Sequence, residues 1–268
     1  MQDYSHCLRP SFTQRVYRRL VEQRQAVNIT GEKGAGRGRV LKDLEQVITA
    51  EGRHVLLIDF NRNQRYYELL EQIESQMLLK KMRSQEEILP KPVQAEYTQF
   101  PITSLFMSYF NPKGAPYLYL LLDNIDRILD NPQQRFPKAF FDDLNYLNNS
   151  PYIFIACTTN KAIGVYQIYY VDENEREEDR LSWLHFPAPL DVSPLQVAEI
   201  EAELNRCLSD NDHWQGQADY IAAIQTHPAS AQFLEYVVNN FDSHEALPIP
   251  QHLERLKARF NHHYPSAH

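Results

Sequence analysis

A cluster of glycines near the start of the chain has the composition of a phosphate-binding loop. Four of the eight glycines fall within residues 31–38, which follow the pattern G-x-x-x-x-G-K-[ST] except at its last two positions. Such glycines let backbone N–H groups surround phosphate oxygens at a helix N-terminus, where the dipole favours anions. ATP or ADP is therefore the candidate ligand, and a glycine-rich turn without function is the alternative. The candidate binding residues are Gly31, Glu32, Lys33, Gly34, Ala35, Gly36, Arg37, Gly38 and Arg39.

The two positions that depart from the pattern are those that hydrolysis depends on most. The lysine that bridges the β- and γ-phosphates is replaced by Arg37, and the Ser or Thr that binds Mg²⁺ is replaced by Gly38. Arginine keeps the charge, but its planar guanidinium is a poor substitute for a compact ammonium. We therefore expect inefficient ATP hydrolysis and impaired Mg²⁺ binding.

A second motif is the hydrophobic run 117–122, which is followed by acidic residues. An aspartate at the tip of such a strand holds the Mg²⁺ shell beside the phosphates, which makes Asp123 the candidate metal ligand. Asn124 stands where many ATPases have a glutamate that polarises water, and Asp126 could take over that role. A buried strand with a polar turn is the alternative interpretation.

A third hydrophobic run, 152–157, is followed by the polar residues Thr158, Thr159 and Asn160. A polar group at this point could sense the γ-phosphate or orient the attacking water. If the chain hydrolyses ATP, the candidate catalytic residues are Asp123, Asp126 and Asn160.

These motifs need a sheet to bring them together. Apolar runs alternate with segments of helical periodicity, which favours a three-layer αβα fold of the α/β class with a parallel sheet. We expect segment 84–101 to be irregular and 102–110 to form a short helix. A parallel sheet binds its ligand at the carboxyl ends of its strands, where all three motifs fall. The expected strands are Val27–Thr30, His54–Asp59, Tyr117–Asp123 and Tyr152–Cys157.

The pattern changes near residue 190. From about Ser193 onward only helical periodicity is visible, with helices expected near 195–208, 217–226, 229–240 and 249–261. We therefore predict two parts: an αβα core over residues 1–190 and a small all-helical subdomain, the lid, over residues 191–268.

The order of these features resembles the AAA+ and STAND group of P-loop ATPases, nearest to its origin-recognition-like and archaeal-ATPase-like branches. The similarity covers roughly 12–260 in organisation but only three short motifs in residues. It implies a five-stranded core, a helical lid, nucleotide at their junction and frequent oligomerisation. By position, Asp123 would face Mg²⁺, and Asn160 or Thr159 would be the sensor. The unranked candidates for an arginine finger or a lid sensor are Arg127, Arg135, Arg206 and Arg255.

Charge and composition limit the kinds of molecule that the chain could bind and the compartment in which it is expected. A net charge of −8 opposes simple electrostatic binding to nucleic acid or to anionic lipid. Three widely spaced cysteines exclude a disulfide framework, and the chain has no apolar run long enough for a secretion signal or a membrane span. We therefore expect a cytoplasmic protein that does not bind membranes.

Two charged segments could contact partners. The acidic run Asp172–Arg180 is predicted to lie on a β-hairpin or flap that either binds a protein partner or is a solvated loop. The basic segment Phe12–Gln25 is predicted to be a helix that packs its apolar face on the sheet and leaves its arginines in water.

The leading functional hypothesis is a non-catalytic or weakly catalytic scaffold or regulatory subunit of a multi-protein system. By family analogy, such systems include mobile-element targeting and anti-phage defence. One alternative is an active ATPase that uses Arg37 and Asp123. A second is a DNA-binding module of the origin-recognition kind.

Overall fold

The structure is a computed structural model that describes residues 3–60, 66–79, 117–129, 136–171, 177–181, 186–208, 217–241 and 247–264. Its centre is a five-stranded sheet in the order β2-β3-β5-β1-β8, in which every pair is parallel. The strands are β1 (Val27–Thr30), β2 (His54–Asp59), β3 (Leu118–Asp123), β5 (Ile153–Thr159) and β8 (Leu190–Asp191). The four predicted strands and their parallel arrangement are confirmed, with small shifts at the ends of two.

The sheet is covered by helices on both faces, which explains why β1, β3 and β5 are buried at every position. Val40, Leu44 and Val47 lie on the apolar stripe of one helix and pack against the face that carries Ile29 and Leu121. The helices on that face are α1 (Pro10–Tyr17), the π-helical turn η1 (Arg18–Glu22) and α2 (Arg37–Ala50). The other face is covered by α3 (Tyr66–Leu79), α5 (Asp126–Leu129) and α6 (Lys138–Asn148).

The predicted packing of the N-terminal helix is confirmed. The apolar face of α1 and η1 is buried against the sheet, with Val16, Tyr17 and Leu20 at 0–1% exposure. Arg18 and Arg24 are exposed, as expected for the charged side of an amphipathic helix.

A second, small sheet carries part of the acidic run. It has the order β4-β6-β7, formed by β4 (Phe136–Pro137), β6 (Gln167–Val171) and β7 (Glu177–Leu181). β6 and β7 are antiparallel, which confirms the predicted hairpin. The rest of the run, 172–176, lies outside the described residues, as do the irregular segment 84–101 and the short helix 102–110. A short 3-10 helix, η2 (Ile163–Val165), precedes β6.

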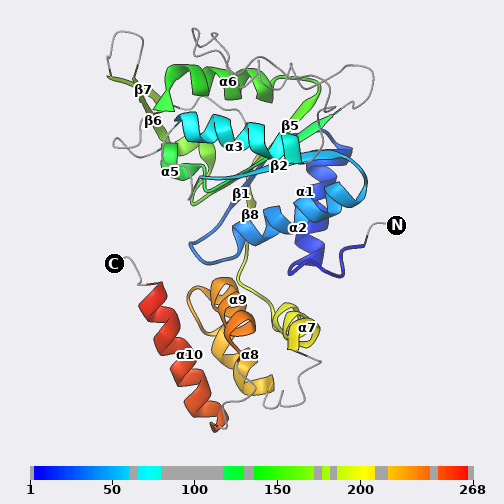
Figure 1. The fold of residues 1–268 in the computed structure, drawn as a ribbon, viewed down its shortest axis with the longest axis vertical. Coiled ribbons are helices and arrows are strands. Elements are labelled where there is room, and N and C mark those ends of the chain that lie inside the picture. Colours follow the sequence, from blue (N-terminus) through cyan, green and yellow to red (C-terminus); the bar gives the residue numbers. More distant parts are fainter. Residues whose placement is uncertain are drawn as a thin grey trace.

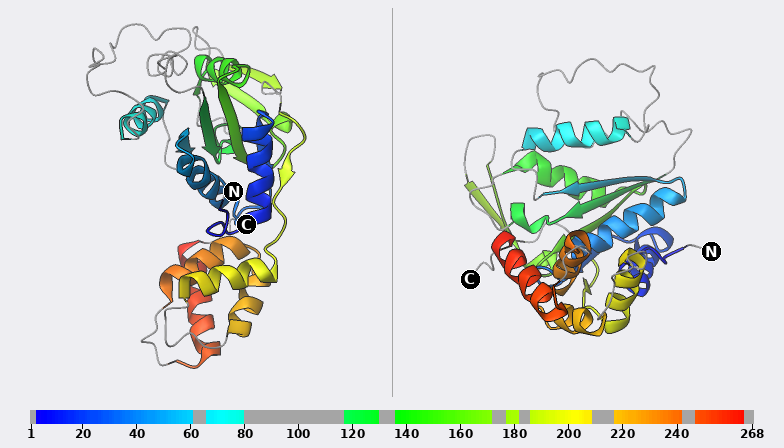
Figure 2. Two further views of the ribbon diagram at one scale, coloured as in Figure 1. Left: turned by 90° about the vertical axis from the view of Figure 1, so that its right-hand side faces the viewer. Right: turned by 60° about the horizontal axis from the view of Figure 1, so that its bottom comes forward.

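The lid lies below the core in Figure 1 and has its own apolar core. Among the described residues after Asp191 there are helices and no strands: α7 (Val197–Leu208), α8 (Gln217–Gln225), α9 (Ser230–Asn240) and α10 (Ile249–His263). Leu8, from the opposite end of the chain, packs into the lid core together with Leu204 and Leu234. In the left view of Figure 2 the lid helices again lie together below the core.

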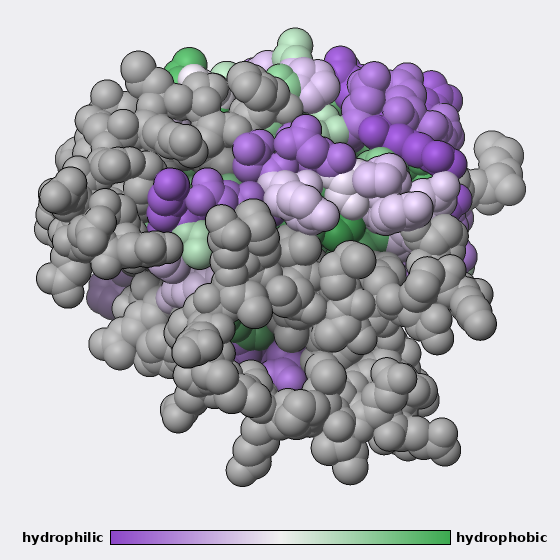
Figure 3. Space-filling view, turned by 90° about the horizontal axis from the view of Figure 1, so that it is seen from above, coloured by the Kyte–Doolittle hydropathy of each residue, from purple (hydrophilic) through white to green (hydrophobic). Residues whose placement is uncertain are grey.

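The described residues form no large apolar area in the view of the side away from the lid. In the space-filling view from above, hydrophilic residues cover most of the coloured surface and hydrophobic residues show only in small separate areas (Figure 3). Within the described ranges, no helix is both long enough and apolar enough to cross a membrane.

Candidate nucleotide-binding site

The glycine loop connects β1 to α2 and is packed directly against the lid. Gly34 and Gly36 have φ values of +86° and +90°, a left-handed conformation that side chains with a Cβ rarely adopt. A Cβ on Gly34 would overlap Ala229, and one on Gly36 would lie 2.8 Å from the Cβ of Ala231. The backbone N–H of Gln232 also donates to the Gly34 carbonyl at 3.3 Å. Glycine is therefore required here both by the turn and by the close approach of α9.

Gly36 is the N-cap residue of α2, so the first turn of this 14-residue helix faces the loop. The first N–H groups of a helix have no partners within it and, with the helix dipole, attract anions. The predicted strand–loop–helix geometry of a phosphate site is therefore present.

The acidic side of the site is held by neighbouring strand tips. The carboxylate of Asp123, at the end of β3, accepts a hydrogen bond from the Thr158 hydroxyl at 2.5 Å. The same hydroxyl accepts one from the backbone N–H of Asn124 at 2.7 Å. Asn124 has a φ of +57°, and its side-chain amide donates to Asp59 at 3.3 Å. Asp59 ends β2 and lies directly beside Asp123 in the strand register.

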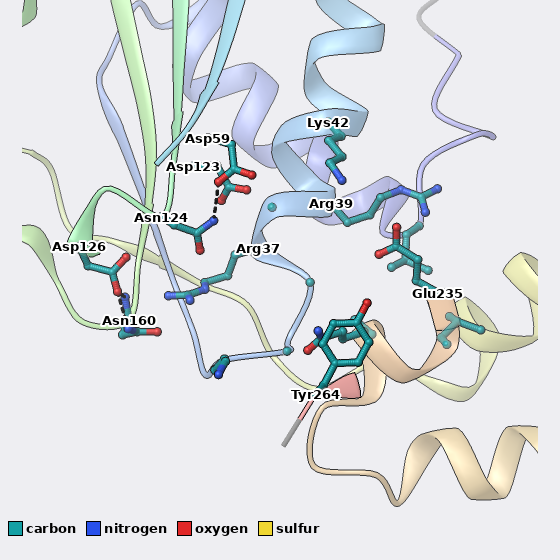
Figure 4. Close-up of a pocket in the computed structure, with 18 of the residues that line it drawn as sticks. Arg37, Arg39, Lys42, Asp59, Asp123, Asn124, Asp126, Asn160, Glu235 and Tyr264 are labelled. Atoms are coloured by element: carbon teal, nitrogen blue, oxygen red, sulfur yellow. Dashed lines mark hydrogen bonds between the residues drawn. The ribbon is translucent and has the colours of Figure 1, made fainter. Parts of the chain in front are cut away.

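Thr159 and Asn160 have different surroundings although they are adjacent. The Thr159 hydroxyl accepts a hydrogen bond from the Asn28 amide at 2.7 Å and donates to the Lys161 carbonyl at 2.6 Å, and its side chain does not line the cavity. Asn160 lines the cavity, and both its amide group and its backbone N–H donate to Asp126. Asp126 and Asn160, predicted from separate motifs, are thus brought together (Figure 4).

Arg37 is the central cation of the site. Its side chain points toward Asp126 and Asn160 (Figure 4), and the residue is only 7% exposed. Within the part of the chain that the structure describes, its Nη1 atom is buried and has no hydrogen-bond partner. Leaving a buried donor of a charged group unsatisfied costs about 1–3 kcal/mol or more, so this atom favours an incoming acceptor.

Burial has the largest effect on the pKa values of the carboxyl groups of Asp123 and Asp126. It raises the pKa of Asp123, and the nearby Asp59 adds to the effect, while Thr158, Arg37 and Lys42 oppose it. Burial likewise raises the pKa of Asp126, and Arg37 is the main opposing charge. Arg37 therefore favours the charged form of both carboxyl groups, but burial outweighs this effect.

These groups line a cavity of about 580 Å³ between the core and the lid, within the usual size range of small-molecule sites. Its predicted lining residues are Lys33, Gly34, Gly36, Arg37, Gly38, Arg39, Asp123, Asp126 and Asn160. Gly31, Glu32 and Ala35 do not line it. The ionisable lining is balanced, with five basic residues (Lys33, Arg37, Arg39, Lys42, Arg127) and five acidic ones (Asp59, Asp123, Asp126, Glu203, Glu235).

Several lining residues were not predicted from the sequence. Asp59 could have been found, because β2, like β3, is an apolar run that ends on an aspartate. Leu8, Lys42, Glu203 and Tyr264 carry no motif and come from distant parts of the chain. Of the candidate finger and sensor arginines, Arg127 lines the cavity, Arg206 and Arg255 do not, and Arg135 lies outside the described residues.

The sheet order, the glycine loop and the helical lid together give the chain the fold of an AAA+ P-loop ATPase of the origin-recognition type. It is similar to a Walker-type ATPase of Pyrococcus abyssi, with a TM-score of 0.58 and 13% identity, over 94% of this chain and 75% of that one. A second similar structure is the ORC1 protein of Aeropyrum pernix in complex with DNA, with a TM-score of 0.56, 14% identity and coverage of 94% and 65%.

Drosophila ORC bound to DNA is similar with a TM-score of 0.50 and 11% identity, over 87% of this chain and 56% of that one. The chain thus spans 56–75% of the length of these three structures. The sequence matches no protein-family model and no curated protein. The predicted fold class and the resemblance in fold are confirmed.

Proposed function

We propose that this chain is a cytoplasmic regulatory or scaffold subunit that binds ATP or ADP between its core and lid and hydrolyses ATP slowly or not at all. The observation that carries the proposal is the guanidinium of Arg37: the residue lines the cavity, and its buried Nη1 atom has no hydrogen-bond partner among the described residues. A phosphate oxygen would satisfy it, and arginine can bind phosphate through two parallel hydrogen bonds.

The weak catalysis follows from what surrounds this cation. Asn124 cannot act as a base toward water, and its amide is engaged with Asp59. Asp126, the remaining candidate base, accepts hydrogen bonds from Asn160. Arg37 and Gly38 stand in place of the lysine and the hydroxyl of the usual loop. The degenerate loop is thus proposed to keep phosphate binding and to lose most of the hydrolytic chemistry.

A nucleotide in this cavity would contact both parts of the chain, since Gln232 and Glu235 of α9 line it together with Arg37 of the core. Binding would therefore favour one arrangement of the lid over others. We propose that a protein partner reads this arrangement, with the acidic hairpin that contains β6 and β7 as one contact, and that self-association is a second possible readout. The net charge of −8 favours a protein partner over nucleic acid.

The test is calorimetric titration of the purified chain with ATP, ADP and AMP. We expect ATP and ADP to bind, and AMP to bind more weakly because it lacks a β-phosphate. Arg37→Ala should weaken ATP binding at least about tenfold, the value of one lost charge-assisted hydrogen bond. Arg37→Lys, which keeps the charge, should lose less.

The matched control is Arg259→Ala, which removes an exposed arginine of α10 that does not line the cavity. It should bind ATP like the wild type. If neither ATP nor ADP binds the folded wild-type chain at millimolar concentration, the proposed function is wrong. DNA binding that persists in Arg37→Ala would favour the origin-recognition alternative.

A further inference from the structure

Gly38 of α2 and Asp123 of β3 lie so close together that residue 38 has no room for a side chain. A Cβ built on Gly38 would overlap Oδ2 of Asp123, and would lie 3.1 Å from its Cγ and 3.2 Å from its Oδ1. The carboxylate of Asp123 thus fills the position of the side chain that Gly38 lacks. A serine or threonine at residue 38 could enter only if Asp123 moved away from α2.

Asp123 is also poorly placed to serve a metal. It is 7% exposed, and its Oδ1 already accepts the Thr158 hydroxyl hydrogen bond. Mg²⁺ requires an octahedral set of oxygen ligands and gives up its water reluctantly. Residue 38, which supplies the Mg²⁺-binding hydroxyl in the usual loop, is a glycine and offers no side-chain oxygen. The residues present therefore do not fit Mg²⁺.

The charge that a metal would supply is available from side chains instead. Arg37 places a guanidinium cation at the first residue of α2, and Lys33 and Lys42 line the same cavity. A guanidinium carries five donors in a rigid planar arrangement that matches phosphate oxygens. The unpartnered Nη1 of Arg37, buried among the described residues, supplies a donor for such a contact without any metal.

We propose that this site binds the phosphates of a nucleoside di- or triphosphate without a divalent cation, with Arg37 as the principal counter-charge. The inference rests on the proposed function. It adds that the nucleotide binds as the free anion and not as its Mg²⁺ complex. It also explains why Gly38 and Asp123 are tolerated together, since neither has to coordinate an ion.

The experiment compares binding of ATP and ADP to the wild-type chain in excess EDTA and in excess Mg²⁺. We expect the dissociation constant in EDTA to equal that in Mg²⁺ within about threefold, or to be lower, because Mg²⁺ neutralises the phosphates that Arg37 attracts. In a second readout, Mn²⁺ replaces Mg²⁺ and its electron paramagnetic resonance spectrum should show no immobilised ion in the ternary mixture.

Gly38→Ser is the variant that tests the geometry. Because the new side chain must displace Asp123, this substitution should weaken nucleotide binding in EDTA. If the variant does not fold, the comparison of EDTA and Mg²⁺ on the wild-type chain still tests the inference. Wild-type binding at least about tenfold tighter in Mg²⁺ than in EDTA, or an immobilised Mn²⁺ signal, would overturn the inference and leave the proposed function standing. No binding in either medium would overturn both.

Discussion

Arg39 of α2 and Glu203 of α7 form an ion pair between the core and the lid, with 3.2 Å between Nη2 and Oε1. Nε of Arg39 also contacts Asp43 at 2.8 Å, and the second oxygen of Asp43 accepts the backbone N–H of Leu8 at 2.9 Å. Oε1 of Glu203 also accepts a hydrogen bond from Nη2 of Arg206 at 2.6 Å, and Oε2 accepts one from Nε of Arg206 at 3.1 Å. The N-terminal segment, α2 and the lid are thus joined by one polar network next to the glycine loop.

This network gives a prediction for Glu203→Gln. The substitution removes the negative charge that Arg39 and Arg206 share, at a side chain that is 7% exposed. Removing one partner of a buried pair costs about 3–5 kcal/mol, but Arg39 and Arg206 are 23% and 43% exposed, and solvent reduces the effect. We expect the free energy of unfolding to fall by about 1–3 kcal/mol, measured by urea denaturation.

The matched control is Glu201→Gln on the same helix, because Glu201 is exposed. It should change stability by less than about 0.5 kcal/mol. Limited proteolysis should also cut the connection 192–196 faster in Glu203→Gln than in the control. Equal stability and equal proteolysis of the two variants would show that the ion pair does not hold the lid.

A second prediction separates backbone strain at the glycine loop from contact with the lid. Gly34→Ala forces a Cβ into a residue with a φ of +86° and into Ala229, whose Cα is 2.8 Å from the ideal Cβ position. Gly52→Ala imposes similar strain, at a φ of +70°, but has no atom within 4 Å of the new Cβ. We expect Gly52→Ala to cost about 1–2 kcal/mol and Gly34→Ala to cost about 1–3 kcal/mol more.

Urea denaturation of both variants measures this difference. ATP binding gives a further readout, because only Gly34→Ala should weaken it by pushing α9 away from the loop. If the two glycines cost the same, the lid does not rest on the loop in solution.

A third prediction concerns hydrolysis. Loss of a single electrostatic donor typically lowers a catalytic rate about 10²–10³-fold, and both the lysine and the hydroxyl of the usual loop are replaced here. We expect negligible steady-state ATP hydrolysis by the purified chain, indistinguishable from that of Arg37→Ala and Asp123→Ala. Turnover near one per second that both substitutions abolish would establish the active-ATPase alternative.

The elements of the core could be predicted because their signals are local. The strands β2, β3 and β5 contain continuous apolar runs, and β1 is a short strand just before the glycine loop. The parallel order of β3 and β5 places Asp123 and Thr158 side by side. β8 was missed because it has two residues, too few for any periodicity. It straddles the proposed boundary at residue 190, since Leu190 and Asp191 both pair with β1.

The lid side of the site could not be predicted from local pattern. Leu8, Glu203 and Tyr264 have the composition of ordinary helical and terminal residues, and only packing brings them to the cavity. Neighbouring residues of a strand point to opposite faces of the sheet. The hydroxyl of Thr159 is accordingly hydrogen-bonded to Asn28, whereas that of Thr158 is hydrogen-bonded to Asp123 at the site. Which of these threonines contacts Asp123 depends on the tilt and register of the strands, which the sequence does not specify.

The last prediction concerns pH and the turn that places Ala229 against Gly34. Nδ1 of His227 accepts a hydrogen bond from the backbone N–H of Ala229 at 3.1 Å, and its ring stacks on Phe233. Burial lowers the pKa of His227 from 6.5, and the nearby Lys257 lowers it further. The neutral ring is thus the form that the folded lid favours, because a protonated Nδ1 cannot accept the hydrogen bond.

A group whose pKa is depressed on folding adds stability above its unfolded pKa, here 6.5, and loses it as the pH falls through the folded value. The variant His227→Asn keeps an acceptor but cannot titrate. Compared with the wild type, it should lose less stability between about pH 7.5 and about pH 5, by about 0.5–1.5 kcal/mol, the worth of one hydrogen bond. Urea denaturation at both pH values measures the difference, with His262→Asn, an exposed histidine of α10, as the control. If wild type and His227→Asn lose equal stability over this range, protonation of His227 does not control the turn.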